Sequence, residues 1–391
     1  MKIAFISTYF TGATFPLMKH LSDKGNKTDL FLFAKNGGRG TEDLSFDKAI
    51  EGYGITEICR TNRIFSYLNP SSHIYLVPFH IVRYRKLLVG YISEFKNILI
   101  CRRLVSILKS EGYDFVYIIV HEALDALVCL YLRKAGFKNV VVAYHEIVDN
   151  HMGTPKLKNV VIDTLKQRYP IITYSQHTKK LLQKATGMNN LNVTYFGPFE
   201  SFGTFDTKSP IIKEPYILYI GIISPYKGLS FLYDTINEKL KNPNFKIVVA
   251  GFGKDDVLEK MNNDGRFIVI NRFLHGNEFA NLICYATCVV CPYVSASQSG
   301  IPQTAMVYGT PVIATKVGAF PEFIEEGKNG YLVDYGDKDS LAGAIMKVAD
   351  GKCLRGFVPE KLKWENIVQQ VEDIFQAVSY THLTLPTNSR V

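Results

Sequence analysis

Short apolar, β-branched runs alternate along the chain with segments of helical periodicity. Near the start, the runs 2–7 and 29–33 flank a helix predicted over 16–23. This alternation favours a parallel sheet with helices on both faces, and therefore a doubly wound α/β fold. Two further groups of such runs follow, at 114–120, 139–144 and 171–174, and then at 216–220, 246–250, 266–270, 288–292 and 310–314.

The length of the chain indicates two domains. Single cores rarely grow beyond about 250 residues, and this chain has 391. The pattern divides into two Rossmann-like α/β domains, over 1–203 and 215–360, joined by a polar linker at 204–214. A last helix is predicted over 361–378. Residues 379–391 resemble translated sequencing-adapter sequence, so we expect a non-native and disordered tail there.

The composition is that of a globular protein with a basic surface. Hydrophobic residues make up 47% of the chain and charged residues 21%, with a net charge of +9, which excludes a disordered or fibrous protein. The positive charge fits a solvated surface, an anionic small substrate or an anionic membrane surface. Because the basic residues are dispersed and no nucleic-acid-binding module is visible, we do not expect nucleic acid as a partner.

The sequence also indicates a compartment. Met1 leads directly into a strand without a secretory signal, and no apolar stretch is long enough to span a bilayer. The seven cysteines lack the spacing of a disulfide framework. We therefore expect a cytoplasmic protein.

The segment 66–109 interleaves aromatic and aliphatic residues with basic ones, most densely over 80–86. Much of it has a helical period. A basic helical face beside aromatic residues is typical of a helix that lies on an anionic membrane surface, and also of a solvated helix over a core. Both interpretations stay open, and the first would place the protein peripherally at the inner face of the membrane.

Three cysteines need an interpretation of their own. Cys284, Cys288 and Cys291 have the C-x3-C-x2-C spacing of some iron–sulfur sites. That chemistry needs three thiolates on one open loop, whereas Cys288 and Cys291 lie in a strand pattern that points them to opposite faces. We interpret all three as core residues.

Two His-Glu pairs follow neighbouring predicted strands. His121-Glu122 comes after 114–120, and His145-Glu146 comes after 139–144. The carboxyl ends of parallel strands meet at one edge of a sheet, so we expect the pairs to lie close together. They could ligate a metal, take part in proton transfer or bind a sugar; without a fixed ligand spacing, the metal is the weakest of these.

The stretch 295–337 combines a small polar loop, a short helix that ends at Gly309, an apolar strand and a second helix. A polar loop that opens a helix at the carboxyl end of a strand favours anion and sugar binding. The stretch resembles the donor-binding segment of retaining glycosyltransferases of family 4 (glycosyl transferases group 1), which have the GT-B fold. The resemblance rests on the ordered motifs Thr310–Ala314, Val317-Gly318, Pro321-Glu322 and Gly327–Gly330.

The resemblance implies two Rossmann-like domains that face each other across a cleft, with the last helix crossing back to the N-terminal domain. It implies that His145 faces the donor sugar and that Lys227 contacts the donor diphosphate, and we predict these two residues as catalytic. Acceptor-side positions are predicted at Thr11, His121 and Glu146. The predicted donor-binding set is Gly12, Gly221, Lys227, Gly251, Gly253, Arg272, Phe273, Ser299, Gly300, Ile301, Gln303 and Thr304.

Three positions depart from the family pattern. Ala296 and Thr304 stand where the family usually has glutamates, and Ile222 stands where it has an arginine. Loss of one of two cations weakens phosphate binding, and loss of the carboxylates removes contacts to the donor sugar. These three departures lie where the donor sugar and the diphosphate would meet.

The expected activity is transfer of a sugar, with retention, from a nucleotide-diphosphate sugar to a saccharide or lipid-linked acceptor in cell-surface polysaccharide or glycolipid synthesis. The nucleotide sugar is a co-substrate, and neither a cofactor nor a metal is expected. Two alternatives stay open: a GT-B protein that binds a sugar nucleotide without catalysis, and a sugar-nucleotide hydrolase or epimerase.

Overall fold

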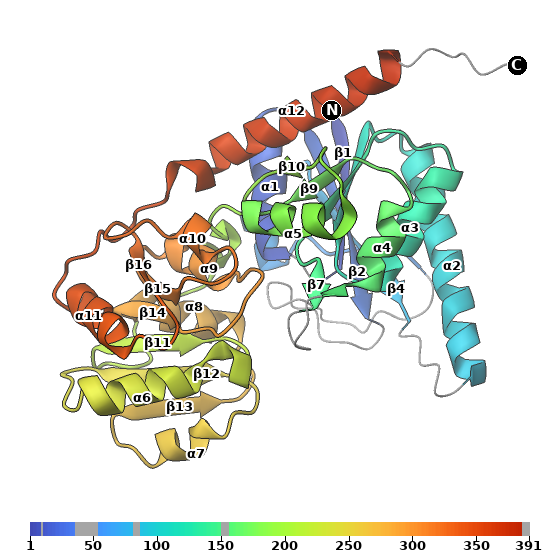
Figure 1. Ribbon diagram of the computed structural model, residues 1–391. Coiled ribbons are helices and arrows are strands. Elements are labelled where there is room, and N and C mark those ends of the chain that lie inside the picture. Colours follow the sequence, from blue (N-terminus) through green and yellow to red (C-terminus); the bar gives the residue numbers. More distant parts are fainter. Residues whose placement is uncertain (9–10, 36–53, 81–86, 150–155, 385–391) are drawn as a thin grey trace, which may run out of the picture.

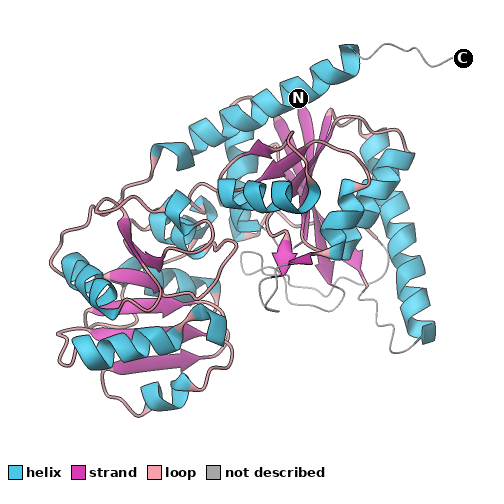
Figure 2. Cartoon of the chain, viewed as in Figure 1, coloured by secondary structure: helices cyan, strands magenta, loops and turns pink. Residues whose placement is uncertain are grey.

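The computed structural model describes residues 1–8, 11–35, 54–80, 87–149 and 156–384. Within them the chain forms two α/β domains that face each other, with a long C-terminal helix lying over the first domain (Figure 1). Each domain is built on a mainly parallel sheet between layers of helices (Figure 2).

The sheet of the N-terminal domain has the order β10-β9-β6-β5-β1-β2-β4-β3, and all its pairs are parallel except β3 with β4. Its central strands are apolar throughout because helices cover both faces. The strands are β1 (Lys2–Thr8), β2 (Lys27–Lys35), β3 (Thr56–Glu57), β4 (His73–Phe79), β5 (Phe115–Val120), β6 (Val140–Tyr144), β9 (Ile171–Thr173) and β10 (Asn192–Val193), with a separate antiparallel pair of β7 (Val148–Asp149) and β8 (Lys156–Leu157). The helices are α1 (Thr11–Asp23), α2 (Leu87–Ser110), α3 (Ala123–Lys134), α4 (Asn159–Leu165) and α5 (Gln176–Thr186).

The C-terminal domain has a fully parallel sheet with the order β13-β12-β11-β14-β15-β16. Its three cysteines at 284, 288 and 291 are free, and Cys288 and Cys291 are buried in the sheet. The strands are β11 (Tyr216–Ile220), β12 (Lys246–Gly251), β13 (Phe267–Asn271), β14 (Cys288–Cys291), β15 (Val312–Thr315) and β16 (Gly330–Val333). The helices are α6 (Leu229–Lys239), α7 (Val257–Asn262), α8 (Gly276–Tyr285), α9 (Ile301–Val307), α10 (Phe320–Phe323) and α11 (Lys338–Ala349).

The last helix, α12 (Trp364–Thr384), packs on α1 of the N-terminal domain. Trp364 is buried, and its indole Nε1 donates to the carbonyl of Pro198 at 2.9 Å. Phe375 stacks on Phe115 with ring centroids 4.5 Å apart. An apolar face of α12 therefore completes the core of the N-terminal domain.

Three sequence expectations differ from the structure. The helix predicted over 16–23 begins earlier, at Thr11. Residues 11–15 resemble a loop in the sequence, but Ala13 and Phe15 are buried and extend the apolar face of the helix. The helical interpretation of 66–109 is wrong for β4, a strand between β2 and β3. The expected disordered tail at 379–391 is wrong in its first part, since α12 continues to Thr384. The basic cluster 81–86 lies outside the described residues.

Candidate active site

The strand order reverses once in each sheet, and predicted site residues follow the strands at that point. The reversal lies between β1 and β5 in the first sheet and between β11 and β14 in the second. Ligands of doubly wound sheets bind at the carboxyl ends of strands there. His121 follows β5, the loop to Lys227 follows β11, and the loop to Ser299 follows β14.

Two neutral histidines lie together at the carboxyl edge of the first sheet. Burial lowers the pKa of His145 to about 3, and His121 and Lys158 act in the same direction. Burial also lowers the pKa of His121, against the opposing charges of Glu122 and Glu146. At neutral pH each imidazole therefore offers one N–H donor and one acceptor nitrogen, which suits hydrogen bonding to a sugar hydroxyl.

Asp125 holds the loop that carries His121. It is fully buried, and its carboxylate accepts the backbone N–H groups of His121 and Glu122, both at 2.8 Å, and the hydroxyl of Thr8 at 3.1 Å. Burial raises the pKa of Asp125 to about 7, although these hydrogen bonds oppose the shift. The sequence contains a signal for this role, since an acid at the third helical position is typical of a capping box.

Glu146 links the two domains electrostatically. Its carboxylate pairs with Lys158 Nζ of the same domain at 2.5 Å. In the C-terminal domain, burial lowers the pKa of Lys227, and the charge of Glu146 opposes that shift. Burial raises the pKa of Tyr226, and the charge of Glu146 adds to that rise. The edges of the two sheets therefore approach each other at the predicted site.

Lys227 is a largely buried cation at the turn before α6. Its Nζ lies 3.7 Å from the centroid of the Tyr293 ring and 5.0 Å from that of Tyr226. Burial lowers the pKa of Lys227 to about 8, while Cys291 and Glu146 act in the opposite direction. A desolvated ammonium against aromatic faces gains from an anion that binds beside it. The chemistry of this position therefore fits a phosphate partner.

Phe199 fills the contact between the domains. Its backbone N–H donates to the carbonyl of Gln303 in the C-terminal domain at 3.2 Å. A Cβ atom added to Gly12 would lie 2.8 Å from the Phe199 ring, and one added to Gly300 would lie 2.7 Å from it. The two glycines, one from each domain, thus leave room for the ring between them. The sequence motifs did not predict this contact.

The loop and helix around 298–304 hold two buried amides. The side-chain amide atoms of Gln303, which is fully buried, and of Gln298 have no hydrogen-bond partner within the described part of the chain. By contrast, Ser299 Oγ accepts the N–H of Ile301 at 3.3 Å, and the Thr304 hydroxyl donates to the carbonyl of Gly300 at 3.0 Å. A buried amide without a hydrogen-bond partner is costly. The Gln303 amide can therefore form hydrogen bonds with a ligand, whereas the Thr304 hydroxyl is already bonded within the helix.

The predicted glycines at the ends of β11 and β12 pack backbone against backbone. Gly251 has φ 148°, and a Cβ atom there would lie 1.7 Å from the carbonyl oxygen of Gly221. Gly253 has the same relation to Ile223, with which it forms an isolated parallel bridge. Only glycine allows these close approaches, so the two loops have a structural reason for their glycines that is independent of a ligand.

Arg272 and Phe273 follow β13 at the same edge. The Arg272 guanidinium makes two hydrogen bonds to the Glu278 carboxylate, at 2.7 and 2.5 Å. Phe273 is exposed, as are Phe252 and Ile222 in the two adjacent loops. Exposed apolar side chains therefore lie beside Arg272 and the exposed Lys254 at this part of the edge. The site roles of Arg272 and Phe273 stay predictions.

Within the described residues, no group of three or more His, Cys, Asp or Glu side chains is arranged to hold a metal ion.

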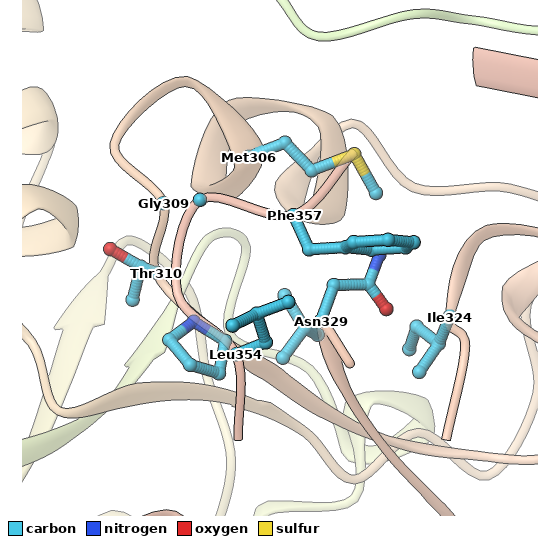
Figure 3. Close-up of a pocket in the computed structure, with 10 residues that line it drawn as sticks. Met306, Gly309, Thr310, Ile324, Asn329, Leu354 and Phe357 are labelled. Carbon is cyan, nitrogen blue, oxygen red and sulfur yellow. The ribbon is translucent and has the colours of Figure 1, made fainter. Parts of the chain in front are cut away.

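One small pocket lies away from these residues, at the amino-terminal ends of β15 and β16. It is lined by Met306, Ile324, Asn329, Leu354 and Phe357, among others (Figure 3). Its volume of about 10 Å³ is enough for roughly one water molecule. It is packing space rather than a substrate site.

The fold and the facing sheet edges are those of the GT-B class. Residues 214–350 match the family model described as glycosyl transferases group 1. The structure superposes on sucrose-phosphate synthase from Thermosynechococcus elongatus with a TM-score of 0.63 and 17% identity, covering 97% of this chain and 100% of that one. It also superposes on an Anabaena HepE structure in complex with UDP, with a TM-score of 0.57, 15% identity and coverage of 98% and 100%.

Curated proteins also match parts of the sequence. An uncharacterized glycosyltransferase of Methanocaldococcus jannaschii is 26% identical over 176 residues, which is 42% of this chain and 45% of the relative. The N-acetyl-alpha-D-glucosaminyl L-malate synthase of Bacillus anthracis is 20% identical over 72% of this chain and 79% of the relative. The chain spans about half the length of the curated relatives that it matches first.

Proposed function

We propose that the chain is a glycosyltransferase that takes a sugar from a nucleotide-diphosphate donor and transfers it to an acceptor hydroxyl. One observation carries the proposal: Lys227, a largely buried cation, lies at the switch point of the domain that matches the family model, close enough to Glu146 of the other domain for their charges to interact. An anionic donor held there would have its sugar between the two sheet edges.

In the proposed reaction the bond between the anomeric carbon and the diphosphate oxygen breaks, and the acceptor oxygen bonds to the same carbon on the same face. The acceptor proton passes to an oxygen of the leaving diphosphate, so configuration is retained without a nucleophile from the protein. Lys227 stabilises the charge that develops on the leaving group. Neutral His145 and His121 bind sugar hydroxyls, and the Gln303 amide supplies a further pair of hydrogen bonds.

The acceptor belongs to the N-terminal domain in this proposal, near Thr11, His121 and Glu146. The expected setting is polysaccharide or glycolipid synthesis in the cytoplasm, without a metal or other cofactor. Closure of the domains around the donor would exclude water, which competes with the acceptor.

A second candidate is a sugar-nucleotide-binding protein without catalysis. Ile222 favours it, because this exposed apolar side chain stands where the resembling family has a cation. Thr304 favours it too, because its buried hydroxyl is bonded to Gly300 and offers no carboxylate.

The test is a panel of UDP-, GDP- and ADP-sugars, with saccharide and lipid-linked acceptors, analysed by mass spectrometry. A glycosylated acceptor, with product lost in His145→Asn and kept in His73→Asn, supports the proposal; His73 is a histidine away from the site that pairs with Glu57. Donor binding without any product supports the second candidate. A free or epimerised sugar without an acceptor contradicts both.

A further inference from the structure

The outer surface of α2 carries an apolar stripe that the fold does not cover. Tyr91, Ile92, Phe95 and Leu99 are exposed, with Tyr91 at 60% and Phe95 at 62%. At 100° per residue, Tyr91, Phe95 and Leu99 follow one another along the same face of the helix. The opposite side of α2, which includes Ile100 and other apolar residues, is buried in the core of the N-terminal domain.

Basic residues continue the stripe along the helix. Arg102 and Arg103 continue the exposed face, Lys109 lies further along it, and Lys96 is half-buried beside Phe95. Among the exposed and half-buried positions from 91 to 110, four are cations and one, Glu94, is an acid. The surface is therefore apolar and positively charged together, and its charge is complementary to a negatively charged partner.

We infer that this surface docks on an anionic lipid bilayer, with Tyr91, Ile92, Phe95 and Leu99 inserted at the level of the headgroups. Aromatic and aliphatic side chains beside arginines and lysines are the combination that interfacial helices use. Each cation near an anionic surface adds attraction that falls off over roughly one Debye length. No helix in the described part of the chain is long and apolar enough to cross a bilayer, so the contact is peripheral.

The place of the stripe in the fold matters for the site. β4 ends at Phe79 on the carboxyl edge of the sheet, and the chain then enters α2 at that edge. The exposed apolar residues lie at or before the middle of α2, whereas Arg102, Arg103 and Lys109 lie further from the carboxyl edge of the sheet. α2 forms the outer flank of the N-terminal domain, opposite the side that faces the C-terminal domain (Figure 1). Docking through this half leaves the side of the N-terminal domain that faces the C-terminal domain uncovered.

The test is co-sedimentation of the full chain with vesicles of pure phosphatidylcholine and with vesicles that contain phosphatidylglycerol. The wild type should bind the anionic vesicles at low salt at least about tenfold more strongly than the neutral ones, and high salt should weaken that binding. Tyr91→Ser/Phe95→Ser should lower the binding by about tenfold or more, and Arg102→Gln/Arg103→Gln by on the order of tenfold.

Matched controls come from the C-terminal side of the chain. Ile211→Ser/Leu354→Ser removes two exposed apolar side chains, and Lys241→Gln/Lys260→Gln removes two exposed cations; both should bind like the wild type. Circular dichroism and Tm identify any variant that fails to fold, and Phe95→Ser alone then replaces the double variant.

Other outcomes overturn the inference. Absence of binding to anionic vesicles contradicts it, as does equal loss in the α2 and control variants. If light scattering shows a dimer that Tyr91→Ser/Phe95→Ser dissociates, and vesicles are not bound, the stripe is an interface between two copies. Vesicle binding needs no turnover, so this result is independent of the proposed activity.

Discussion

Glu322 of the C-terminal domain caps a helix of the N-terminal domain. Its Oε1 accepts the backbone N–H of His177 at 2.7 Å, and its Oε2 accepts that of Gln176 at the same distance. These N–H groups open α5, where the helix dipole favours a negative charge. A carboxylate on one domain thus closes the first turn of a helix on the other.

We expect Glu322→Ala to loosen the contact between the domains. The variant loses two charge-assisted hydrogen bonds, each worth at most about 1.5–3 kcal/mol, and less here because the site is partly exposed. Small-angle scattering should give a larger radius of gyration for Glu322→Ala, and Glu322→Gln should lie between it and the wild type. Glu325→Ala, which removes a pair with Lys328 inside one domain, is the control; an equal change in both variants would rule out a specific interdomain role.

The contact of Phe199 with Gly12 and Gly300 predicts that a methyl group added at either glycine lowers the stability of the protein. Gly12→Ala and Gly300→Ala each place a Cβ under 3.0 Å from the ring, so the ring must move, at a cost of about 1–3 kcal/mol of unfolding free energy. Gly343→Ala is the control, because its Cβ meets nothing within 4 Å and alanine is favoured in a helix by up to about 1 kcal/mol. Urea unfolding measures all three, and unchanged stability in both site variants would contradict the packing argument.

We predict that anion binding at Lys227 is coupled to the uptake of a proton. Its amine has a pKa of about 8 because it is buried, and a bound diphosphate stabilises the charged form, so binding takes up a proton near and above that pH. The affinity for UDP, GDP or ADP should therefore fall as the pH rises from 7 to 9. Titration calorimetry in two buffers of different ionisation enthalpy measures the uptake; its persistence in Lys227→Arg would assign the proton to another group.

Asp125 predicts a pH-dependent stability. Its pKa is raised to about 7, so the folded protein keeps a proton that the unfolded chain loses near pH 4, and the stability that this group contributes is lost as the pH rises toward 7. Between pH 5 and 8 the loss amounts to about 2 kcal/mol. Asp125→Asn should flatten this slope in urea unfolding, whereas Asp163→Asn, an exposed carboxylate, should not. An unchanged slope in Asp125→Asn would contradict the assignment.

The sequence predicted the strands of both Rossmann-like sheets because their apolar runs are buried on both faces and depend little on the rest of the chain. It missed β4, because the segment of aromatic and basic residues that contains this strand has a largely helical period. It placed His121 near His145 because neighbouring parallel strands end at one edge. It missed the interdomain contacts of Phe199 and Glu322, because their partners lie on the other domain. The capping position of Asp125 could be predicted from its sequence neighbours, but its hydrogen bond with Thr8, at the end of another strand, could not.

The most direct test of the account is the initial rate of sugar transfer, at saturating donor, in Lys227→Gln and in Lys260→Gln. Lys260 is an exposed lysine of the same domain. Loss of a preorganised group that stabilises leaving-group charge costs about a hundredfold or more. We predict a fall of at least that size for Lys227→Gln and an unchanged rate for Lys260→Gln. A Lys227→Gln rate within about threefold of the wild type would contradict a diphosphate bound at Lys227, and with it the proposed site.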